Sequence, residues 1–283
     1  MNKNIISAVL VLIFSSCTKA PFSSDMKLGG KIVSTSQLNK GYKVYQAKCL
    51  SCHGDKGDGK GITHRALLTK PRNLTQGMYK FGLSLNGGLP TDEDFANILN
   101  HGLNGTAMLP WKLTKEETTS VTQYIKTFAL NVWDDKSYVK PERAEFTSDP
   151  YQETYEMMAI KKGKEVYHKT AQCFVCHKAY LPVEEMRIIT GDMTLTAASD
   201  VYQLKPQDTS YFLGEDEDKL LTNLPPDFTY HNVRSTKNVE ELYKRISVGV
   251  NGTTMPAWKD ALTDDEIWAV AYYVNSLIKS KNE

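Results

Sequence analysis

The sequence predicts a mainly α-helical protein with two tandem small domains. Three observations favour this fold class. The second half of the chain repeats motifs of the first, each copy closes with a helical pattern, and no alternating apolar run is long enough to predict a strand. Of the 283 residues, 41% are hydrophobic and 24% are charged, as in globular proteins with apolar cores. The net charge of +1 predicts no general attraction to nucleic acid.

The N-terminus has the pattern of an export signal. Lys3 precedes an apolar run over residues 5–14, which is too short for a membrane-spanning helix of about 20 residues. The following Ser-Ser-Cys resembles a bacterial lipobox, although Phe14 replaces the usual Leu. We expect a signal peptide over residues 1–16, lipidation of Cys17 and a tether over residues 17–36 without apolar period. A plain signal peptide with an incidental cysteine is the alternative.

The repeat consists of four motifs in the same order in both copies. They are Gly-x-x-Val-Tyr, Cys-x-x-Cys-His, a proline-led segment, and Gly-x-Asn-Gly-Thr-x-Met with Trp three residues later. This order predicts two copies of one domain. The motifs begin at residues 41, 49, 71 and 102 in the first copy, and at residues 163, 173, 225 and 249 in the second.

Each copy ends in a helix with a clear start signal. Thr114 and Glu117 match a capping box in the first copy, as do Thr263 and Glu266 in the second. Apolar residues then recur at helical spacing. We therefore expect domains over residues 37–130 and 155–283.

The segments between the repeated motifs differ in character. Residues 131–154 contain prolines and acidic residues without periodicity, so we expect a surface linker there. In the second domain about residues 178–224 form a long, acidic insertion, where the first has only a short glycine-rich loop.

The spacing Cys-x-x-Cys-His is the attachment signature of a c-type haem. Two thiols at this spacing can bond the vinyl groups of one macrocycle, and the adjoining histidine then ligates the iron. A zinc site would need two more ligands for each motif, and a disulfide would leave both histidines unexplained. We expect two covalently bound haem c groups. The attachment residues are Cys49, Cys52, Cys173 and Cys176, with His53 and His177 as proximal ligands.

The second axial ligand is expected to be methionine. Met108 and Met255 each follow an Asn-Gly turn at matching positions of the repeat, which would hold a thioether sulfur on a fixed loop. A methionine can also be core filler. His101 is a rival ligand in domain one, but Val248 takes its place in domain two.

Both halves resemble class I cytochrome c domains, over residues 37–130 and 155–279. The resemblance implies that each domain wraps around its haem and that Pro71 and Pro225 direct a carbonyl to the proximal histidine. It also implies that the first helix packs on the last through a small residue against an aromatic residue. The matching pairs here are Gly41 with Tyr124 and Gly163 with Tyr273.

The whole chain resembles bacterial dihaem cytochromes c with a lipoprotein signal. The resemblance implies an electron carrier, or an electron-transfer subunit of an oxidoreductase complex, rather than an enzyme. It implies redox proteins as partners and a location on the periplasmic side of a bacterial membrane, through a lipid on Cys17. A dihaem peroxidase and a haem sensor are the alternatives, and both need one labile iron site.

Charge is divided unevenly between the domains. Residues 37–130 contain 12 basic and 7 acidic residues, a net charge of +5, whereas residues 155–283 contain 15 and 19, a net charge of −4. This split is either ordinary surface variation or two docking faces of opposite sign. The residues that would make these faces are Lys56, Lys60, Arg65, Lys70 and Arg72 in domain one and the acidic run 215–218 in domain two.

Overall fold

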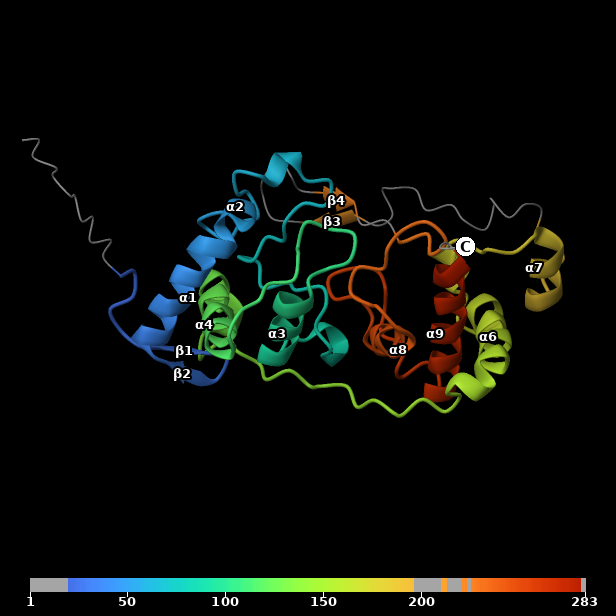
Figure 1. Ribbon diagram of the computed structural model, residues 1–283. Coiled ribbons are helices and arrows are strands. Elements are labelled where there is room, and N and C mark those ends of the chain that lie inside the picture. Colours follow the sequence, from blue (N-terminus) through green and yellow to red (C-terminus); the bar gives the residue numbers. More distant parts are fainter. Residues whose placement is uncertain (1–19, 196–209, 213–219, 223–224, 281–283) are drawn as a thin grey trace, which may run out of the picture.

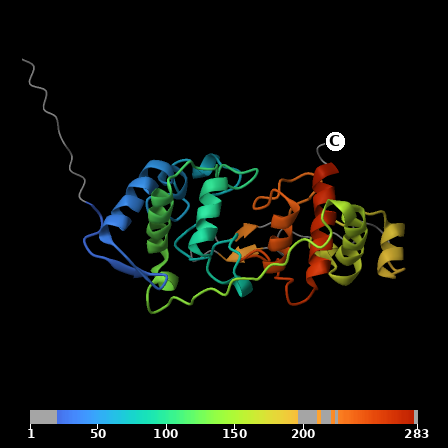
Figure 2. The ribbon, with the colours of Figure 1, turned by 60° about the horizontal axis from the view of Figure 1, so that its bottom comes forward.

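The chain forms an elongated molecule with its two domains end to end (Figure 1). The computed structural model describes residues 20–195, 210–212, 220–222 and 225–280. Helices of domain one occupy one end and helices of domain two the other (Figures 1 and 2). Where the domains meet, α8 (Val239–Val248) contacts the 3-10 turn Leu85–Gly87 of domain one. The predicted mainly helical fold with two tandem domains is confirmed.

Domain one is built from two long helices and shorter elements around a loop-rich centre. Its short β-hairpin is antiparallel, with Met26 opposite Val33. Its elements are β1 (Met26–Leu28), β2 (Lys31–Val33), α1 (Thr35–Lys48), α2 (Leu50–His53), the 3-10 turns His64–Ala66 and Leu85–Gly87, α3 (Asp92–His101), α4 (Lys115–Lys126), the 3-10 turn Thr127–Ala129 and α5 (Leu130–Trp133).

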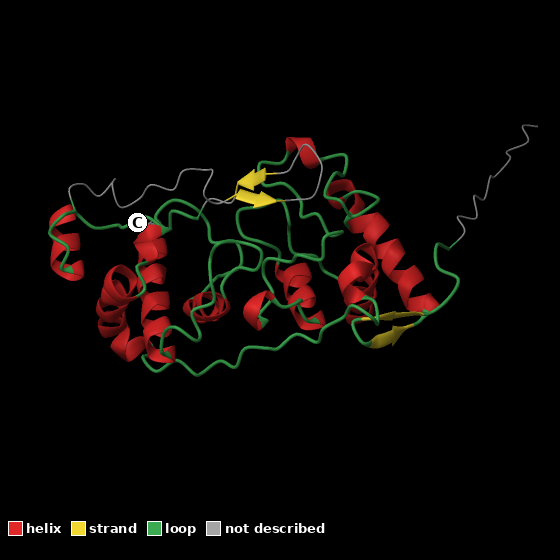
Figure 3. Ribbon diagram, turned by 180° about the vertical axis from the view of Figure 1, so that it is seen from behind, coloured by secondary structure: helices red, strands yellow, loops and turns green. Residues whose placement is uncertain are grey.

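Domain two repeats this plan with additions. A π-helical turn over Val166–Thr170 follows its first helix directly. Its elements are the 3-10 turn Glu153–Tyr155, α6 (Glu156–Glu165), the 3-10 turn Cys173–Val175, α7 (Val183–Thr190), the hairpin of β3 (Ser210–Phe212) and β4 (Leu220–Thr222), α8 (Val239–Val248) and α9 (Asp264–Lys279). Figure 3 shows helices at both ends of the molecule and long loops in its middle.

The first and last helices of each domain cross at a glycine, as expected. A Cβ added to Gly41 in α1 would lie 2.1 Å from the Ser120 carbonyl oxygen of α4. A Cβ added to Gly163 in α6 would lie 1.9 Å from the Ala269 carbonyl oxygen of α9. Only glycine lets these backbones approach so closely, so the crossing is fixed by sequence in both domains.

The predicted capping boxes are present at the starts of α4 and α9. Thr114 accepts from the backbone N–H of Glu117, whose carboxylate accepts from the N–H of Thr114. Thr263 and Glu266 make the same reciprocal bonds. Each pair satisfies backbone donors that would otherwise be unpaired at a helix start.

The prediction of a tether over residues 17–36 is wrong from Met26 onward. Residues 26–33 form the β1–β2 hairpin, whose Leu28 and Val33 are buried in the core of domain one. Gly29 and Gly30 adopt positive φ angles and make the turn between the strands. Strands of three residues are too short to show an alternating pattern, which explains the error.

The linker over residues 131–154 packs on the domains more closely than expected for a surface linker. It begins in α5, where Trp133 is buried and its ring stacks on Tyr138. Further along, Ala144 donates its N–H to the carbonyl of Leu83, and Tyr151 is buried in the core of domain two. The segment therefore joins the domains while packing on both.

Several predicted features lie outside the described residues. These are the signal peptide, Cys17, the acidic run 215–218 and residues 196–209, 213–219 and 223–224 of the insertion. Within the described part of the chain, no helix has the length and apolar character needed to cross a bilayer.

Candidate haem sites

Domain one encloses a cavity of about 320 Å³ that brings its predicted haem residues together. Cys49, Cys52, His53 and Met108 all line it. They come from the end of α1, from α2 and from the loop after α3, so the fold joins segments that are far apart in the sequence. His101 is exposed, is not among the lining residues, and directs its Nδ1 at a carbonyl of its own helix.

The two Cys-x-x-Cys-His motifs share the backbone hydrogen bonds that close them, although the first lies in a short α-helix and the second in a 3-10 turn. The N–H of His53 donates to the Cys49 carbonyl at 2.9 Å, and the N–H of His177 donates to the Cys173 carbonyl at 2.8 Å. A single helical turn in each motif sets the spacing between its two cysteines. The motifs therefore present equivalent groups in both domains.

Each proximal histidine is oriented by a backbone carbonyl, one residue later than expected. The Nδ1–H of His53 donates to the carbonyl of Arg72 at 3.2 Å, and the Nδ1–H of His177 donates to that of Pro226 at 3.4 Å. The predicted acceptors, Pro71 and Pro225, are thus each wrong by one position. Such a bond fixes the tautomer and leaves Nε2 for a metal.

Glycines hold the carbonyl that His53 uses. A Cβ added to Gly59, which has a φ of +79°, would lie 2.6 Å from the Pro71 oxygen. The N–H of Gly59 also donates to the carbonyl of His53, and the N–H of Leu74 donates to that of Gly57. Because the backbones touch here, the Pro71 carbonyl lies against Gly59 and the next carbonyl faces the histidine.

The two methionine loops make the same two hydrogen bonds. Met108 accepts through its carbonyl from Leu103 N–H at 2.8 Å, and its own N–H donates to Thr106 Oγ1 at 3.1 Å. In domain two, Met255 accepts from Val250 N–H at 3.2 Å and donates to Thr253 Oγ1 at 3.1 Å. The loop is therefore a defined structure, which a core-filling methionine would not require.

Tyr45 and Tyr167 belong to the sites but carried no predicted role. The Tyr45 hydroxyl donates to the carbonyl of Gly54, directly after the proximal histidine, at 2.7 Å. The Tyr167 hydroxyl donates to the carbonyl of Lys178, the equivalent residue, at 2.8 Å. The repeated Gly-x-x-Val-Tyr motif was the signal that pointed to them.

The protonation of these groups suits neutral ligands. Burial raises the pKa of the Cys49 and Cys173 thiols to about 12, so an unmodified thiol at either position is protonated at neutral pH. Burial lowers the pKa of His53, and it lowers that of His177 to about 4, which keeps both imidazoles neutral. The four described cysteines are free, and the described residues contain no cluster of three or more His, Cys, Asp or Glu side chains able to hold a metal ion.

Comparison with known proteins identifies both halves. A family model for cytochrome c matches residues 38–129, and one for subunit III of cbb3-type cytochrome c oxidase matches residues 158–274. A chain of the Kuenenia stuttgartiensis reducing HAO-like protein complex Kustc0457/Kustc0458 is 32% identical, with a TM-score of 0.65. The match covers 84% of this chain and 96% of that chain. A comparison with curated proteins found no match.

The chain is a cytochrome c with two tandem domains. Domains of this family carry covalently bound haem and transfer electrons. The cavity of domain one is where the candidate attachment and ligand residues of its motifs come together.

In domain two of the cytochrome the candidate ligands lie in the main apolar core. Phe228 stacks on the imidazole of His177, with ring centroids 4.9 Å apart. Met255 and Cys173 are half-buried and pack against the same cluster of buried residues. The second site thus combines the same donor groups as the first, with an aromatic ring packed on its histidine.

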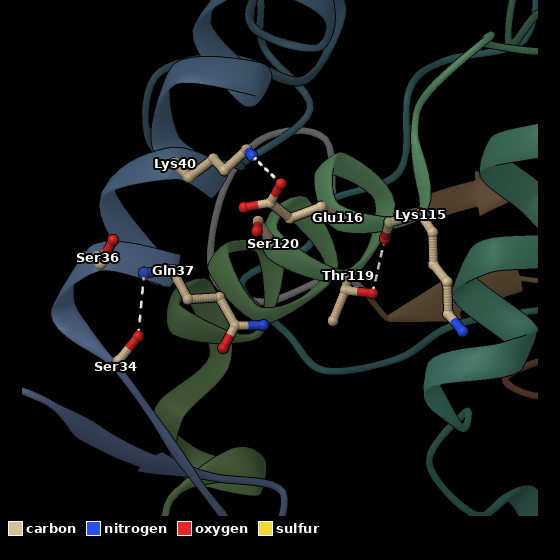
Figure 4. A pocket seen from close by; sticks show the side chains of 8 residues that line it. All are labelled: Ser34, Ser36, Gln37, Lys40, Lys115, Glu116, Thr119 and Ser120. Atoms are coloured by element: carbon tan, nitrogen blue, oxygen red, sulfur yellow. Dashed lines mark hydrogen bonds and ion pairs between the residues drawn. The ribbon is translucent and has the colours of Figure 1, made fainter.

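The cytochrome has another hollow, of about 490 Å³, near the start of α1 (Figure 4). Lys40 and Glu116 form an ion pair of 2.5 Å beside it, and Thr119 donates to the carbonyl of Lys115. None of the predicted ligands lines it, and its lining side chains are polar. It has no role in haem binding.

Proposed function

We propose that this cytochrome is an exported electron carrier with two haems, each held by one Cys-x-x-Cys-His motif and ligated by histidine and methionine. The observation that carries the proposal is the identical construction of the two methionine loops, at Met108 and Met255. Haem supplies an iron centre that takes up and releases one electron, and a thioether ligand favours its ferrous state.

The residues of the chain contribute position and environment. His53 and His177 are each held by a backbone carbonyl, so their Nε2 atoms face the haem site as neutral donors. The apolar wall around Leu74, Phe95 and Leu99 excludes water from one face. Small structural change on electron transfer is the expected consequence of such a fixed shell.

The two alternatives require a labile iron site. A peroxidase or a sensor would need one domain without a fixed sixth ligand. Both methionine loops are equally well bonded, and this supports a fixed sixth ligand in each domain over a labile iron site.

The test is the mass and the spectrum of the purified protein. We expect a mass two haems above the chain, haem retained after denaturation, and a weak near-infrared band of sulfur-ligated ferric iron. Carbon monoxide should hardly change the reduced spectrum. A mass showing one haem or none would end the dihaem proposal, and strong carbon monoxide binding would favour a sensor or a peroxidase.

We further propose that Cys17 is lipidated and anchors the cytochrome on the periplasmic side of a bacterial membrane. The support is the signal-like sequence of residues 1–16. Cys17→Ser should move the protein to the soluble periplasmic fraction with both haems in place. Unchanged membrane association would refute the anchor.

We propose redox proteins as partners, within an assembly. The similar Kuenenia stuttgartiensis chain belongs to a reducing HAO-like protein complex. A subunit role for this cytochrome is tested by native purification through a C-terminal tag. Co-purification of a haem-containing oxidoreductase supports it, and recovery of the cytochrome alone supports a free carrier.

A further inference from the structure

The charged residues on the wall of the domain-one cavity all have the same sign. Besides His53, five side chains that line the cavity are basic, and no acidic residue is among the described residues that line it. An apolar cavity with clustered cations favours an anionic ligand group. The five are Lys48, Lys70, Arg72, Lys80 and Arg234.

One of these cations comes from the other domain. Arg234 lies in domain two, between its haem motif and α8, yet its guanidinium donates to the Thr69 hydroxyl of domain one at 3.3 Å. Its backbone carbonyl accepts from the N–H of Asn104, in the loop that leads to Met108, at 2.8 Å. Domain two therefore completes the wall of the domain-one cavity.

Contacts on both sides of Arg234 hold it there. The Asn104 side chain donates to the carbonyl of Thr236 at 2.9 Å. Nearby, Arg245 of α8 donates to the carbonyls of Phe81 and Gly82, each at 3.0 Å. These bonds fix the segment that carries Arg234 against the mouth of the cavity.

Arg72 and Arg234 lie close enough to Lys80 to disfavour the charge on its ammonium. The pKa of Lys80 is lowered to about 8, first because the ammonium is partly buried and then because Arg72 and Arg234 are close. A negatively charged ligand group between them would remove this repulsion. Haem carries two propionate carboxylates, and these would supply the negatively charged group.

The repeat gives an independent argument for the role of this position. Lys80 lies nine residues after Pro71, and Arg234 lies nine residues after the equivalent Pro225. Both basic residues line the domain-one cavity. Equivalent positions of the two domains thus meet at the interface, beside one haem site.

We propose that Arg234 is a positioning residue that domain two contributes to the haem of domain one, where it binds a propionate together with Lys80. The proposal rests on the presence of haem in domain one, as proposed above. Under this proposal, the contact between the two domains helps to set the reduction potential of the domain-one haem. A positive charge beside the site favours the reduced, more negative state, so its loss lowers the potential.

The experiment compares three variants of the full-length dihaem protein by spectroelectrochemical titration. Arg234→Gln removes the charge at the cavity. Lys237→Gln is the matched control, since Lys237 also crosses the interface, to the His101 carbonyl at 3.5 Å, without lining the cavity. Arg234→Lys keeps the charge. The domain-one haem is the wave that Met108→His displaces.

We expect Arg234→Gln to lower the potential of that wave, Lys237→Gln to shift it much less, and Arg234→Lys to restore most of the wild-type value. Equal shifts in the two glutamine variants, or none, would overturn the proposal, and so would a shift that Arg234→Lys does not reverse. A mass spectrum that shows two haems in each variant separates these outcomes from failure of the carrier proposal itself.

Discussion

Arg245 in α8 of domain two donates to the carbonyl oxygen of Gly82 in domain one at 3.0 Å. The same guanidinium donates to the carbonyls of Phe81 and of Gly249, the glycine that opens the Met255 loop. It also lies over the Phe81 ring, 5.5 Å from its centroid. Burial lowers the pKa of Arg245 to about 10, so it stays charged at neutral pH. One buried cation therefore ties domain one to the Met255 loop of domain two.

Loss of Arg245 should open the interface. Arg245→Leu removes charge-assisted bonds to three carbonyls, which corresponds to about 2–4 kcal/mol of stability. We expect a lower unfolding temperature and a larger radius of gyration by small-angle scattering, with both haems retained. The control is Lys244→Leu, the neighbouring residue on α8, whose ammonium pairs with Glu240 on its own helix. Equal effects of the two variants would show that Arg245 does not hold the two domains together.

The helix crossings predict strong, domain-specific effects of alanine at two glycines. Gly41→Ala places a methyl group against the Ser120 carbonyl, and Gly163→Ala places one against the Ala269 carbonyl. Since both partners are backbone atoms, the helices must separate, at a cost of about 1–3 kcal/mol or more. Each variant serves as the control for the other. Hydrogen exchange should show faster opening only in the domain that carries the change, and opening of both domains would contradict the prediction.

Stability of domain one should fall in acid through Asp92. Partial burial raises the pKa of its carboxyl, but hydrogen bonds and ion pairs with Lys126 and Lys31 outweigh that effect, so the net shift is downward from 3.8. Burial also lowers the pKa of Lys126. Its ammonium still titrates at alkaline pH, so the loss of stability in acid comes from the Asp92 carboxyl. A carboxyl whose pKa is lower in the folded state stabilises the fold at pH values above its unfolded-state pKa. This stabilisation is lost as the pH falls through its folded-state pKa.

Asp92→Asn tests this pH dependence. At neutral pH the variant should lose about 2–3 kcal/mol, because it leaves the buried Lys126 ammonium without its partner. The difference from wild type should shrink as the pH falls below about 4. The matched control is Glu93→Gln, which removes an exposed ion pair with Arg143 and should change little at any pH. A constant difference between Asp92→Asn and wild type across the acid range would contradict the assignment.

Features with local signals were predicted well from the sequence. The capping boxes at Thr114 and Thr263, and the helix crossings at Gly41 and Gly163, each depend on residue types at fixed spacing. The cavity joins Cys49, Cys52, His53 and Met108 as the repeat indicated. In such cases the chemistry of the residue and its position determine the structure together.

Features set by distant contacts were not predicted. Nothing near Arg234 or Arg245 signals that they bind groups more than 150 residues earlier in the chain. The histidine acceptor differs by one residue from the expected proline because the tight packing at Gly59 turns the Pro71 carbonyl aside. The β1–β2 hairpin is stabilised by the core that it covers, and its three-residue strands have no pattern of their own.

The proposed ligation of the two haem irons by Met108 and Met255 predicts a separate change in reduction potential for each haem. Met108→His and Met255→His should each lower the potential of one haem, because imidazole favours ferrous iron less than a thioether does. The near-infrared band of the sulfur-ligated iron should fall by about half in each variant, if the two haems contribute equally. Met78→Leu is the control, since this methionine is not among the residues that line the domain-one cavity. Unchanged potentials in the histidine variants would make these methionines core residues.

The surface beside the domain-one cavity should steer charged redox partners. Leu68 lines the cavity and is fully exposed, and exposed basic residues lie near it in sequence: Lys56, Lys60, Arg65 and Lys70. Arg72, in contrast, is half-buried and donates to the Met78 carbonyl, so reversing it would test folding rather than docking. The predicted acidic face at residues 215–218 lies outside the described residues and stays a prediction.

We expect Lys60→Glu with Arg65→Glu to slow oxidation by an anionic small-molecule oxidant on the order of tenfold at low ionic strength. Oxidation by a cationic reagent should become faster, and both effects should fade with salt, because screening shortens the range of surface charges. The control is Lys136→Glu with Lys140→Glu, which makes the same change in net charge on the exposed linker. If the control pair changes the rates as much, net charge alone governs the encounter. If neither pair changes them, the uneven charge of the two domains is ordinary surface variation.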